Sequence, residues 1–319
     1  MAREIRVGVV GAGNMGTNHA QTICNEVPEA KLIAVADKDF SRAETLAGRW
    51  GVKACRDVRE LVACGVDAVI VTTPTRTHRE VAGVALEEGK HTLVEKPLAA
   101  DIAAAQDIVD LAAGRLRLAV GHVEHFNPAV ETLMNIVSGG ELGQILMTNS
   151  RRVGPHPPQI KDTGVILDLG VHEILILTQM LGMLPNLVFA AGRAQNGEWE
   201  DLAGIILKFS GGITSLVEVN WLTPTKLRTM TAIGEFGVAD VNYQTQTVAV
   251  NGTDRNVRRG HPLKAELQDF VDSISDSRDP RITGAMGVQA VAIATATLES
   301  MQTHSPVTLA DWFKTAGQR

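Results

Sequence analysis

Hydrophobic positions along the first third of the chain follow two alternating patterns. Short runs rich in β-branched residues predict strands at 5–10, 32–36, 68–72, 92–94 and 116–120. The segments between them space their apolar residues as amphipathic helices do, at 15–23, 41–50, 57–63, 77–88 and 102–113, with Ser41 and Asp57 as N-caps. This alternation predicts an α/β unit, a doubly wound parallel sheet with helices on both faces.

The pattern changes after Gly121. Asn127 and Pro128 suit the N-cap and first position of a helix ending near Ser138, and a strand at 145–153 and a helix at 168–181 follow. Runs at 202–209, 213–221 and 227–234, joined by short turns, predict an open antiparallel sheet, and helices at 263–274 and 288–301 are expected to close it. We therefore expect an N-terminal α/β domain, 1–121, and a C-terminal α+β domain, 122–319, whose uncovered sheet face is buried in a homo-oligomer.

Composition narrows the class of protein. The formal net charge is −6 and aromatic residues make up 4%, which argues against nucleic acid as a partner. Three cysteines without a C-x-x-C pair favour free thiols in a reducing compartment. The first apolar run is too short and glycine-broken for a secretory signal. The long apolar region 165–191 contains Asp168, His172, Glu173 and Pro185, so we expect no membrane span and a cytoplasmic protein.

Three glycines follow the first strand in G-x-G-x-x-G spacing. Gly11 allows the tight turn, Gly13 lets the backbone approach a pyrophosphate, and Gly16 lets helix and strand pack closely, while Asn14 and Met15 open the helix. The pattern predicts a Rossmann dinucleotide site, the alternative being a plain structural turn.

The second strand ends in an acid at the place where a dinucleotide ribose is bound. Asp37 would accept hydrogen bonds from the adenosine ribose and repel a 2′-phosphate, which favours NAD over NADP. The neighbouring Lys38 could instead pair with such a phosphate, so both cofactors stay open on these residues.

Polar residues cluster where the later strands end, which is where ligands bind in such sheets. Thr73, Pro74 and His78 follow one strand, and Glu95, Lys96 and Pro97 follow the next. The proline disfavours the helical conformation at Lys96, so this lysine is expected to face the ligand. The alternative is a solvated surface lysine.

Asp168 and His172 are four residues apart on a predicted helix, which places both on one face. Hydride transfer from a secondary alcohol needs a base for the hydroxyl proton. An imidazole can take or relay that proton, and a lysine amine can take it when burial and a neighbouring positive charge favour its neutral form. The alternatives are an exposed helical pair, a capping acid at Asp168, or a metal pair. No third ligand is evident here, and His122 with His125 reads as crevice lining, so we expect no metal site.

Four stretches together resemble the Gfo/Idh/MocA oxidoreductases: GVVGAGNMG at 8–16, TTPTRTH at 72–78, EKP at 95–97 and DLGVHEI at 168–174. The resemblance implies a nicotinamide-binding Rossmann domain followed by an α/β domain with an open antiparallel sheet. It also implies that Lys96 and His172 are catalytic, with Asp168 beside them. The family often has a second acid where this chain has Leu175.

The stretches 122–130 and 151–173 resemble the branch of this family that acts on UDP-N-acetylhexosamines. That resemblance implies oxidation of the C3 hydroxyl of UDP-N-acetylglucosamine to a 3-keto sugar, a precursor of amino sugars such as those of lipid A. The alternatives are another sugar, uronate or inositol dehydrogenase, or a nicotinamide-binding regulator without turnover.

A sugar nucleotide needs local positive charge for its diphosphate. Arg151, Arg152 and Lys161 flank the proline-rich segment 154–158, although adjacent arginines in a strand point to opposite faces, so only one would reach the ligand. Both could equally be solvated. Asn127 could donate to the sugar or serve only as a cap.

Overall fold

The computed structural model describes residues 4–112, 114–158, 160, 162–195 and 197–310. The chain forms two compact units. The first contains the residues up to Val123 together with His261–Val291, and the second contains Glu124–Gly260 and the residues from Ala292 onward. Each unit is described by itself.

The first unit is built on a six-stranded sheet within the described residues, and all its strand pairs are parallel. Its strands are β1 (Ile5–Val10), β2 (Ala30–Ala36), β3 (Lys53–Cys55), β4 (Ala68–Val71), β5 (His91–Glu95) and β6 (Leu118–Gly121). Their order, β3-β2-β1-β4-β5-β6, is that of a doubly wound dinucleotide-binding sheet. The predicted N-terminal fold class is therefore confirmed, and the switch in strand order falls between β1 and β4.

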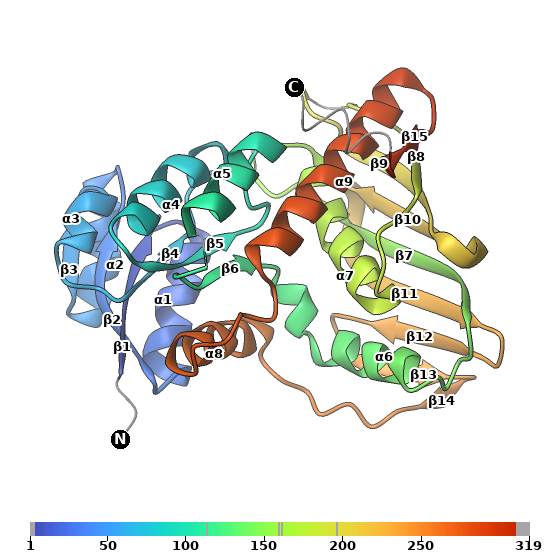
Figure 1. The fold of residues 1–319 in the computed structure, drawn as a ribbon, viewed down its shortest axis with the longest axis horizontal. Helices are drawn as coiled ribbons and strands as arrows, with labels where there is room; N and C mark the ends of the chain where they lie inside the picture. The colour runs from blue at the N-terminus through green and yellow to red at the C-terminus, as the bar shows by residue number, and fades with distance from the viewer. Residues whose placement is uncertain (1–3, 113, 159, 161, 196, 311–319) are drawn as a thin grey trace. The chain divides into compact units, whose positions relative to one another are not determined.

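Helices flank this sheet (Figure 1). They are α1 (Asn14–Glu26), α2 (Phe40–Trp50), α3 (Val58–Val62), α4 (His78–Glu87), α5 (Ile102–Ala112) and α8 (Pro262–Ser275), with the short 3₁₀ segment η1 (Thr75–Thr77) before α4. Asp57 caps α3 through the backbone N–H of Glu60 at 2.9 Å, as predicted. Ser41 is not a cap: α2 begins one residue earlier, Asp39 holds the N-cap position, and the Ser41 hydroxyl donates to the Asp39 carboxylate.

Helix α8 corrects one expectation about the end of the chain. The sequence suggested that it closes the C-terminal sheet, but Leu267, Phe270 and Val271 lie in the same core as Val7, Val9 and Leu32 of the first unit. Hydrophobic spacing shows that a helix has a buried face and does not show which core receives it.

The second unit is built on a nine-stranded described sheet of order β14-β13-β12-β11-β7-β10-β9-β8-β15. Its strands are β7 (Ile145–Pro155), β8 (Leu187–Arg193), β9 (Leu202–Lys208), β10 (Thr214–Asn220), β11 (Leu222–Gly234), β12 (Val238–Asn242), β13 (Thr247–Val250), β14 (Thr253–Asp254) and β15 (Val307–Thr308). The predicted open antiparallel sheet is confirmed apart from one pair: β7 and β10 run parallel, which makes the sheet mixed.

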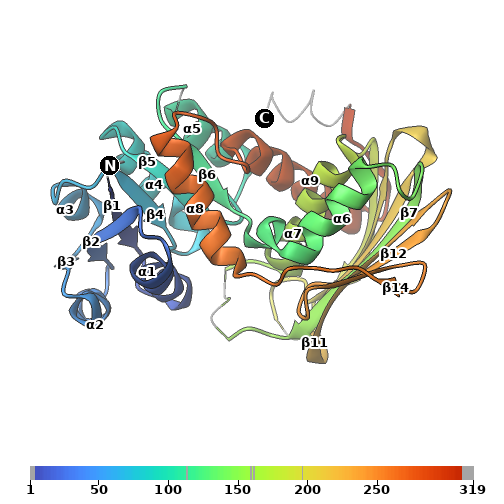
Figure 2. The same ribbon diagram turned by 90° about the horizontal axis from the view of Figure 1, so that it is seen from below.

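Helices cover one face of this sheet (Figure 2). They are α6 (Pro128–Ser138), α7 (Val171–Leu181) and the C-terminal part of α9 (Gly284–Thr303), and short segments η2 (Val123–Phe126) and η4 (Ser210–Gly212) connect strands and helices. Asn127 caps α6 through the N–H of Ala129 at 3.0 Å, as predicted. The helix expected over 168–181 is two helices, because a π-helical turn, η3 (Ile166–Gly170), precedes α7.

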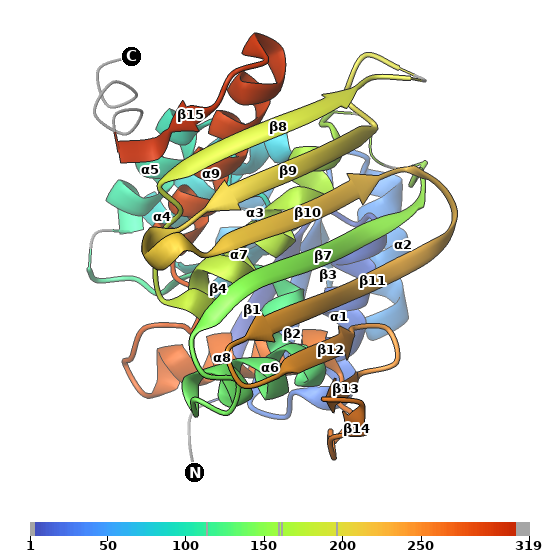
Figure 3. The same cartoon turned by 90° about the vertical axis from the view of Figure 1, so that its right-hand side faces the viewer.

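The other face of the nine-stranded sheet carries no helix of the described part of this unit (Figure 3). Its side chains are mixed: Ile206 and Leu216 are half-buried, and Arg151 and Glu218 form an exposed pair beside them. Among the described residues, no helix is long and apolar enough to cross a membrane.

Candidate functional site

The glycine turn after β1 has the shape that a dinucleotide pyrophosphate requires. Gly11 has φ of +105°, a conformation that favours glycine. A Cβ on Gly16 would lie 1.7 Å from the carbonyl oxygen of Gly11, so α1 packs against the turn only because Gly16 has no side chain. A Cβ on Gly13 would meet nothing within 4 Å. The N-terminus of α1 therefore follows an unobstructed glycine turn, and Asn14 is exposed in its first turn. The free N–H groups of such a helix start suit an anion.

Asp37 lies beside this turn, as predicted. Its carboxylate accepts hydrogen bonds from the N–H of Ala12 at 2.7 Å and of Asp39 at 2.9 Å. These bonds fix the acid at the end of β2, next to the glycine turn, where it can also accept from ribose hydroxyls. Lys38 is exposed, and Met15 packs against the core of the unit.

The turns after β4 and β5 are tied together by a buried histidine. The two ring nitrogens of His78 lie 2.8 Å from the carbonyl oxygen of Thr73 and 3.0 Å from that of Pro97. Burial lowers the pKa of His78. A neutral ring has one N–H and can donate to only one of these two carbonyl oxygens at a time. His78 therefore lies between the backbones of both turns, Pro74 stays exposed on its turn, and the Thr73 hydroxyl accepts from Thr77 at 2.9 Å.

Lys96 follows directly on the last residue of β5 and is half-buried. Its peptide bond to Pro97 is cis. Oε2 of Glu95 accepts from the backbone N–H of Lys96 at 3.2 Å, and Oε1 of Glu95 lies 2.8 Å from Nε2 of the buried His19. The side chain of Glu95 thus links α1 to the turn that presents the lysine.

In the second unit, a buried arginine joins β7 to α7. The guanidinium of Arg152, 1% exposed, donates to Glu173 at 2.7 Å and to Glu124 at 3.0 Å. The hydroxyl of Tyr243 donates to the second oxygen of Glu173 at 3.1 Å. Burial opposes the charge of Arg152, yet Glu124 and Glu173 raise its pKa above the ordinary value, so the ion pairs are formed. This cluster, called here the arginine cluster, fixes the start of α7 immediately after His172.

Asp168 and His172 both lie at this end of α7 and are 6% and 7% exposed. Asp168 stands in the π turn, whose wider spacing changes the i, i+4 alignment that we predicted for a plain α-helix. Arg228, which the sequence did not single out, interacts with Asp168, Glu124 and Glu173, while burial and the charge of Arg152 lower its pKa. An acid, an imidazole and a second arginine therefore gather around one helix start.

The predicted diphosphate-binding residues have separate positions. Arg151 and Arg152 point to opposite faces of β7, as strand alternation requires. Arg151 is paired with Glu218 across the strands at 2.6 Å and is largely exposed, whereas Arg152 is buried in the arginine cluster. The side-chain amide of Asn127 accepts from the N–H of Ala129 and donates to the Tyr243 carbonyl oxygen and to the Glu124 carboxylate. Lys161 lies outside the described residues.

Several residues of these groups were missed by sequence reasoning. His19 falls three positions after Gly16 and could have been noticed as a histidine on the inner face of the glycine-motif helix. Glu173, Glu124 and Tyr243 are far apart in the chain, and no spacing rule joins them.

Three family models match the chain. They are the oxidoreductase family with NAD-binding Rossmann fold over residues 5–122, the GFO/IDH/MocA C-terminal domain over 130–240, and the oxidoreductase family C-terminal alpha/beta domain over 220–309.

Individual relatives are dehydrogenases of polyhydroxylated compounds. The UDP-N-acetylglucosamine 3-dehydrogenase of Acidithiobacillus ferrooxidans is 28% identical over 91% of this chain and 95% of that protein, and its solved structure matches with a TM-score of 0.87 over 95% of this chain and 99% of that one. The scyllo-inositol 2-dehydrogenase (NAD(+)) of Bacillus subtilis is 27% identical over 97% of both proteins. An oxidoreductase from Agrobacterium radiobacter, 20% identical over 97% of this chain and 99% of that one, shares the fold with a TM-score of 0.89.

The family models and the glycine turn agree on the chemistry of the first unit. The matched Rossmann domain is an NAD-binding one, and the open surface at Gly13 with Asp37 beside it fits that dinucleotide. NAD is therefore the cofactor, and the chain belongs to the Gfo/Idh/MocA family of oxidoreductases.

Proposed function

We propose that this NAD-dependent dehydrogenase oxidises the C3 hydroxyl of UDP-N-acetylglucosamine to the 3-keto sugar nucleotide. The observation that carries the proposal is the likeness to the Acidithiobacillus ferrooxidans 3-dehydrogenase, which extends over nearly the full length of both chains in sequence and in fold. The resemblance of segments 122–130 and 151–173 to the UDP-N-acetylhexosamine branch supports the same substrate. The product would then serve an aminotransferase of the cytoplasm.

In the proposed reaction the first unit holds the cofactor and supplies an amine. Bound NAD provides the hydride acceptor. Gly11, Gly13 and the start of α1 would hold its pyrophosphate, and Asp37 would accept from its adenosine ribose. Lys96, half-buried on the turn fixed by Glu95, takes the hydroxyl proton in its neutral form or orients the hydroxyl in its charged form.

The second unit supplies an imidazole in a charged surrounding. We propose that His172 takes or relays the hydroxyl proton and that Asp168 orients or stabilises the ring. The arginine cluster supports this role because Glu173, the next residue, is clamped by Arg152 and Tyr243. Arg228, only half-buried on the same sheet, is a better candidate for a substrate phosphate than Arg152, whose charge is already paired.

The test is turnover in a mixture of purified protein, NAD and one substrate at a time, followed by the absorbance of reduced nicotinamide. UDP-N-acetylglucosamine is expected to give the highest kcat/KM. Lys96→Ala should bind NAD with unchanged affinity and lose about 10²–10⁴ in kcat, the usual contribution of a general acid or base. Lys31→Ala, an exposed lysine of β2, is the matched control and should behave as wild type. Full activity of Lys96→Ala would refute the assignment of the amine.

A second candidate is an inositol dehydrogenase. It is favoured by the scyllo-inositol enzyme of Bacillus subtilis, which matches at nearly the same identity over the whole chain. Reduction of NAD with scyllo-inositol or myo-inositol, and none with UDP-N-acetylglucosamine, would select this function.

We also propose that the uncovered face of the nine-stranded sheet pairs with a second copy of the chain. Half-buried Ile206 and Leu216 stand on that face beside the Arg151–Glu218 pair, and a face of mixed apolar and charged side chains suits an interface between subunits. Light scattering at micromolar concentration should give at least a dimer, and a monomer would refute the proposal.

A further inference from the structure

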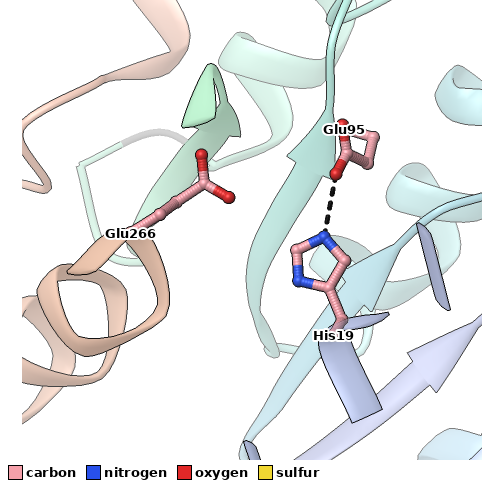
Figure 4. A group of neighbouring side chains, drawn as sticks. All are labelled: His19, Glu95 and Glu266. Carbon is pink, nitrogen blue, oxygen red and sulfur yellow. Dashed lines mark hydrogen bonds and ion pairs between the residues drawn. The ribbon is translucent and has the colours of Figure 1, made fainter. Parts of the chain in front are cut away.

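Three buried side chains from distant parts of the sequence converge in the first unit. His19 of α1, Glu95 at the end of β5 and Glu266 of α8 are 0%, 7% and 2% exposed. One ligand atom from each lies within 4.8 Å of the others. The carboxylate of Glu266 points toward the His19–Glu95 pair (Figure 4). We call these residues the buried triad.

The hydrogen bonds of the buried triad leave acceptors without donors. Nε2 of His19 lies 2.8 Å from the Glu95 carboxylate, so a proton is shared between these two atoms. Among the described residues, neither Nδ1 of His19 nor either oxygen of Glu266 has a hydrogen-bond partner. The Glu266 carboxylate is thus a buried acceptor to which no described group donates.

A buried carboxylate without a partner costs several kcal/mol if it is charged. Burial, followed by the charges of Glu95 and Asp269, raises the pKa of Glu266 well above its ordinary value. The unfavourable energy disappears if a cation is shared among the same atoms. Two carboxylates and a neutral imidazole carry a charge of −2, which a divalent ion balances.

We propose that His19, Glu95 and Glu266 form a binding site for a divalent transition-metal ion of the zinc class. Imidazole nitrogen together with carboxylate oxygen suits zinc, manganese or iron(II) better than magnesium, which prefers oxygen ligands and retained water. An ion bound to Nε2 of His19 and to the carboxylates of Glu95 and Glu266 would replace the proton that Nε2 and Glu95 share, and Nδ1 would then carry the N–H of the ring. Bonds of about 2.1 Å join ligand atoms up to about 4 Å apart, so a small rotation of Glu266 closes the site.

The ion would act on structure rather than on the hydride step. It would tie α1, β5 and α8 of the first unit together, and through Oε2 of Glu95 it would steady the backbone N–H of Lys96. The competing arrangement is a protonated Glu266 with a bridging water, which satisfies the same acceptors without an ion.

Metal content and metal-dependent stability distinguish the two arrangements. Purified protein is stripped with a chelator, dialysed, and titrated with Zn²⁺, Mn²⁺ or Co²⁺, with the melting temperature and the visible absorption of Co²⁺ as readouts. The matched pair of variants is Glu266→Gln and Asp272→Asn, the second a half-buried acid of the same helix whose carboxylate accepts from the Gln268 side chain.

The proposal expects one equivalent of metal per chain in wild type and in Asp272→Asn, with a rise in melting temperature that grows with metal concentration. Glu266→Gln should lose at least 10-fold in affinity and the Co²⁺ absorption. Two results would overturn it: wild type that shows neither bound metal nor a shift in melting temperature, or equal binding by Glu266→Gln and wild type. The wild-type result alone decides the question if Glu266→Gln fails to fold, which circular dichroism reveals.

Discussion

Each unit buries carboxylates at or near a residue that we propose for catalysis, but the two units satisfy these carboxylates differently. In the second unit Glu173 follows His172, and Arg152 and Tyr243 satisfy its oxygens from within the chain. In the first unit Glu95 precedes Lys96, and the neighbouring Glu266 finds no partner among the described residues.

The arginine cluster satisfies its carboxylates with residues of the chain itself, whereas the buried triad contains a carboxylate that no described residue satisfies. A buried charge that is fully paired orients its neighbours. Removing one partner leaves the other charge buried without a counter-charge, which is destabilising. A buried charge that is not paired must take up a proton, a water or an ion. The arginine cluster is therefore expected to depend on its own residues, and the buried triad on what it binds.

The largest effect is expected when the arginine cluster is disrupted. Arg152→Met should lower the free energy of unfolding by about 3–5 kcal/mol, because Glu173 and Glu124 lose their shared counter-charge. Arg151→Met, its neighbour in an exposed pair with Glu218, should cost less than about 1 kcal/mol. Urea unfolding of both variants measures this contrast. Similar losses in the two would mean that the arginine cluster is not what sets α7 in place.

A smaller effect of opposite sign is expected in the buried triad. In chelator-treated protein, Glu266→Gln should raise the free energy of unfolding by up to about 2 kcal/mol, since it removes a carboxyl that has no partner. The same urea measurement applies. A loss of stability greater than about 1 kcal/mol would show that Glu266 is satisfied in a way that the triad does not explain.

The smallest effect concerns acid stability. Burial opposes ionisation of Glu124, but Arg152 holds the pKa of this carboxyl below its usual range. A depressed folded pKa gives stability that is present above the unfolded pKa of about 4.3 and is lost as pH falls through the lower folded value. The free energy of unfolding should therefore fall more steeply below about pH 4.3 in wild type than in Glu124→Gln. An equal pH dependence of the free energy of unfolding in the two proteins over this acid range would contradict the ion pair.

Much of the fold was predictable because it depends on local patterns. Strand and helix periods predicted every described strand of the first sheet except the short β3, the glycine spacing predicted its dinucleotide turn, and Asn127 with Pro128 predicted the start of α6. The alternation rule also separated Arg151 from Arg152. Each of these follows from a few adjacent residues.

What the sequence did not reveal depends on contacts between distant segments. Helix α8 packs in the first unit although it follows the second sheet along the chain. Residue spacing gave no sign of the parallel pairing of β7 with β10 or of the π turn at Asp168. His19, Glu95 and Glu266 come together only in the fold, so neither the buried triad nor its unpaired acid could be read from the motifs.

The most direct test of the proposed function is the fate of the hydrogen at C3 of the sugar. UDP-N-acetylglucosamine that carries deuterium at C3 is turned over with NAD, and the reduced cofactor is analysed by mass spectrometry. The account predicts one deuterium in the NADH formed and none when the label is at C4. Unlabelled NADH from the C3-deuterated substrate, or no NADH at all, would contradict it.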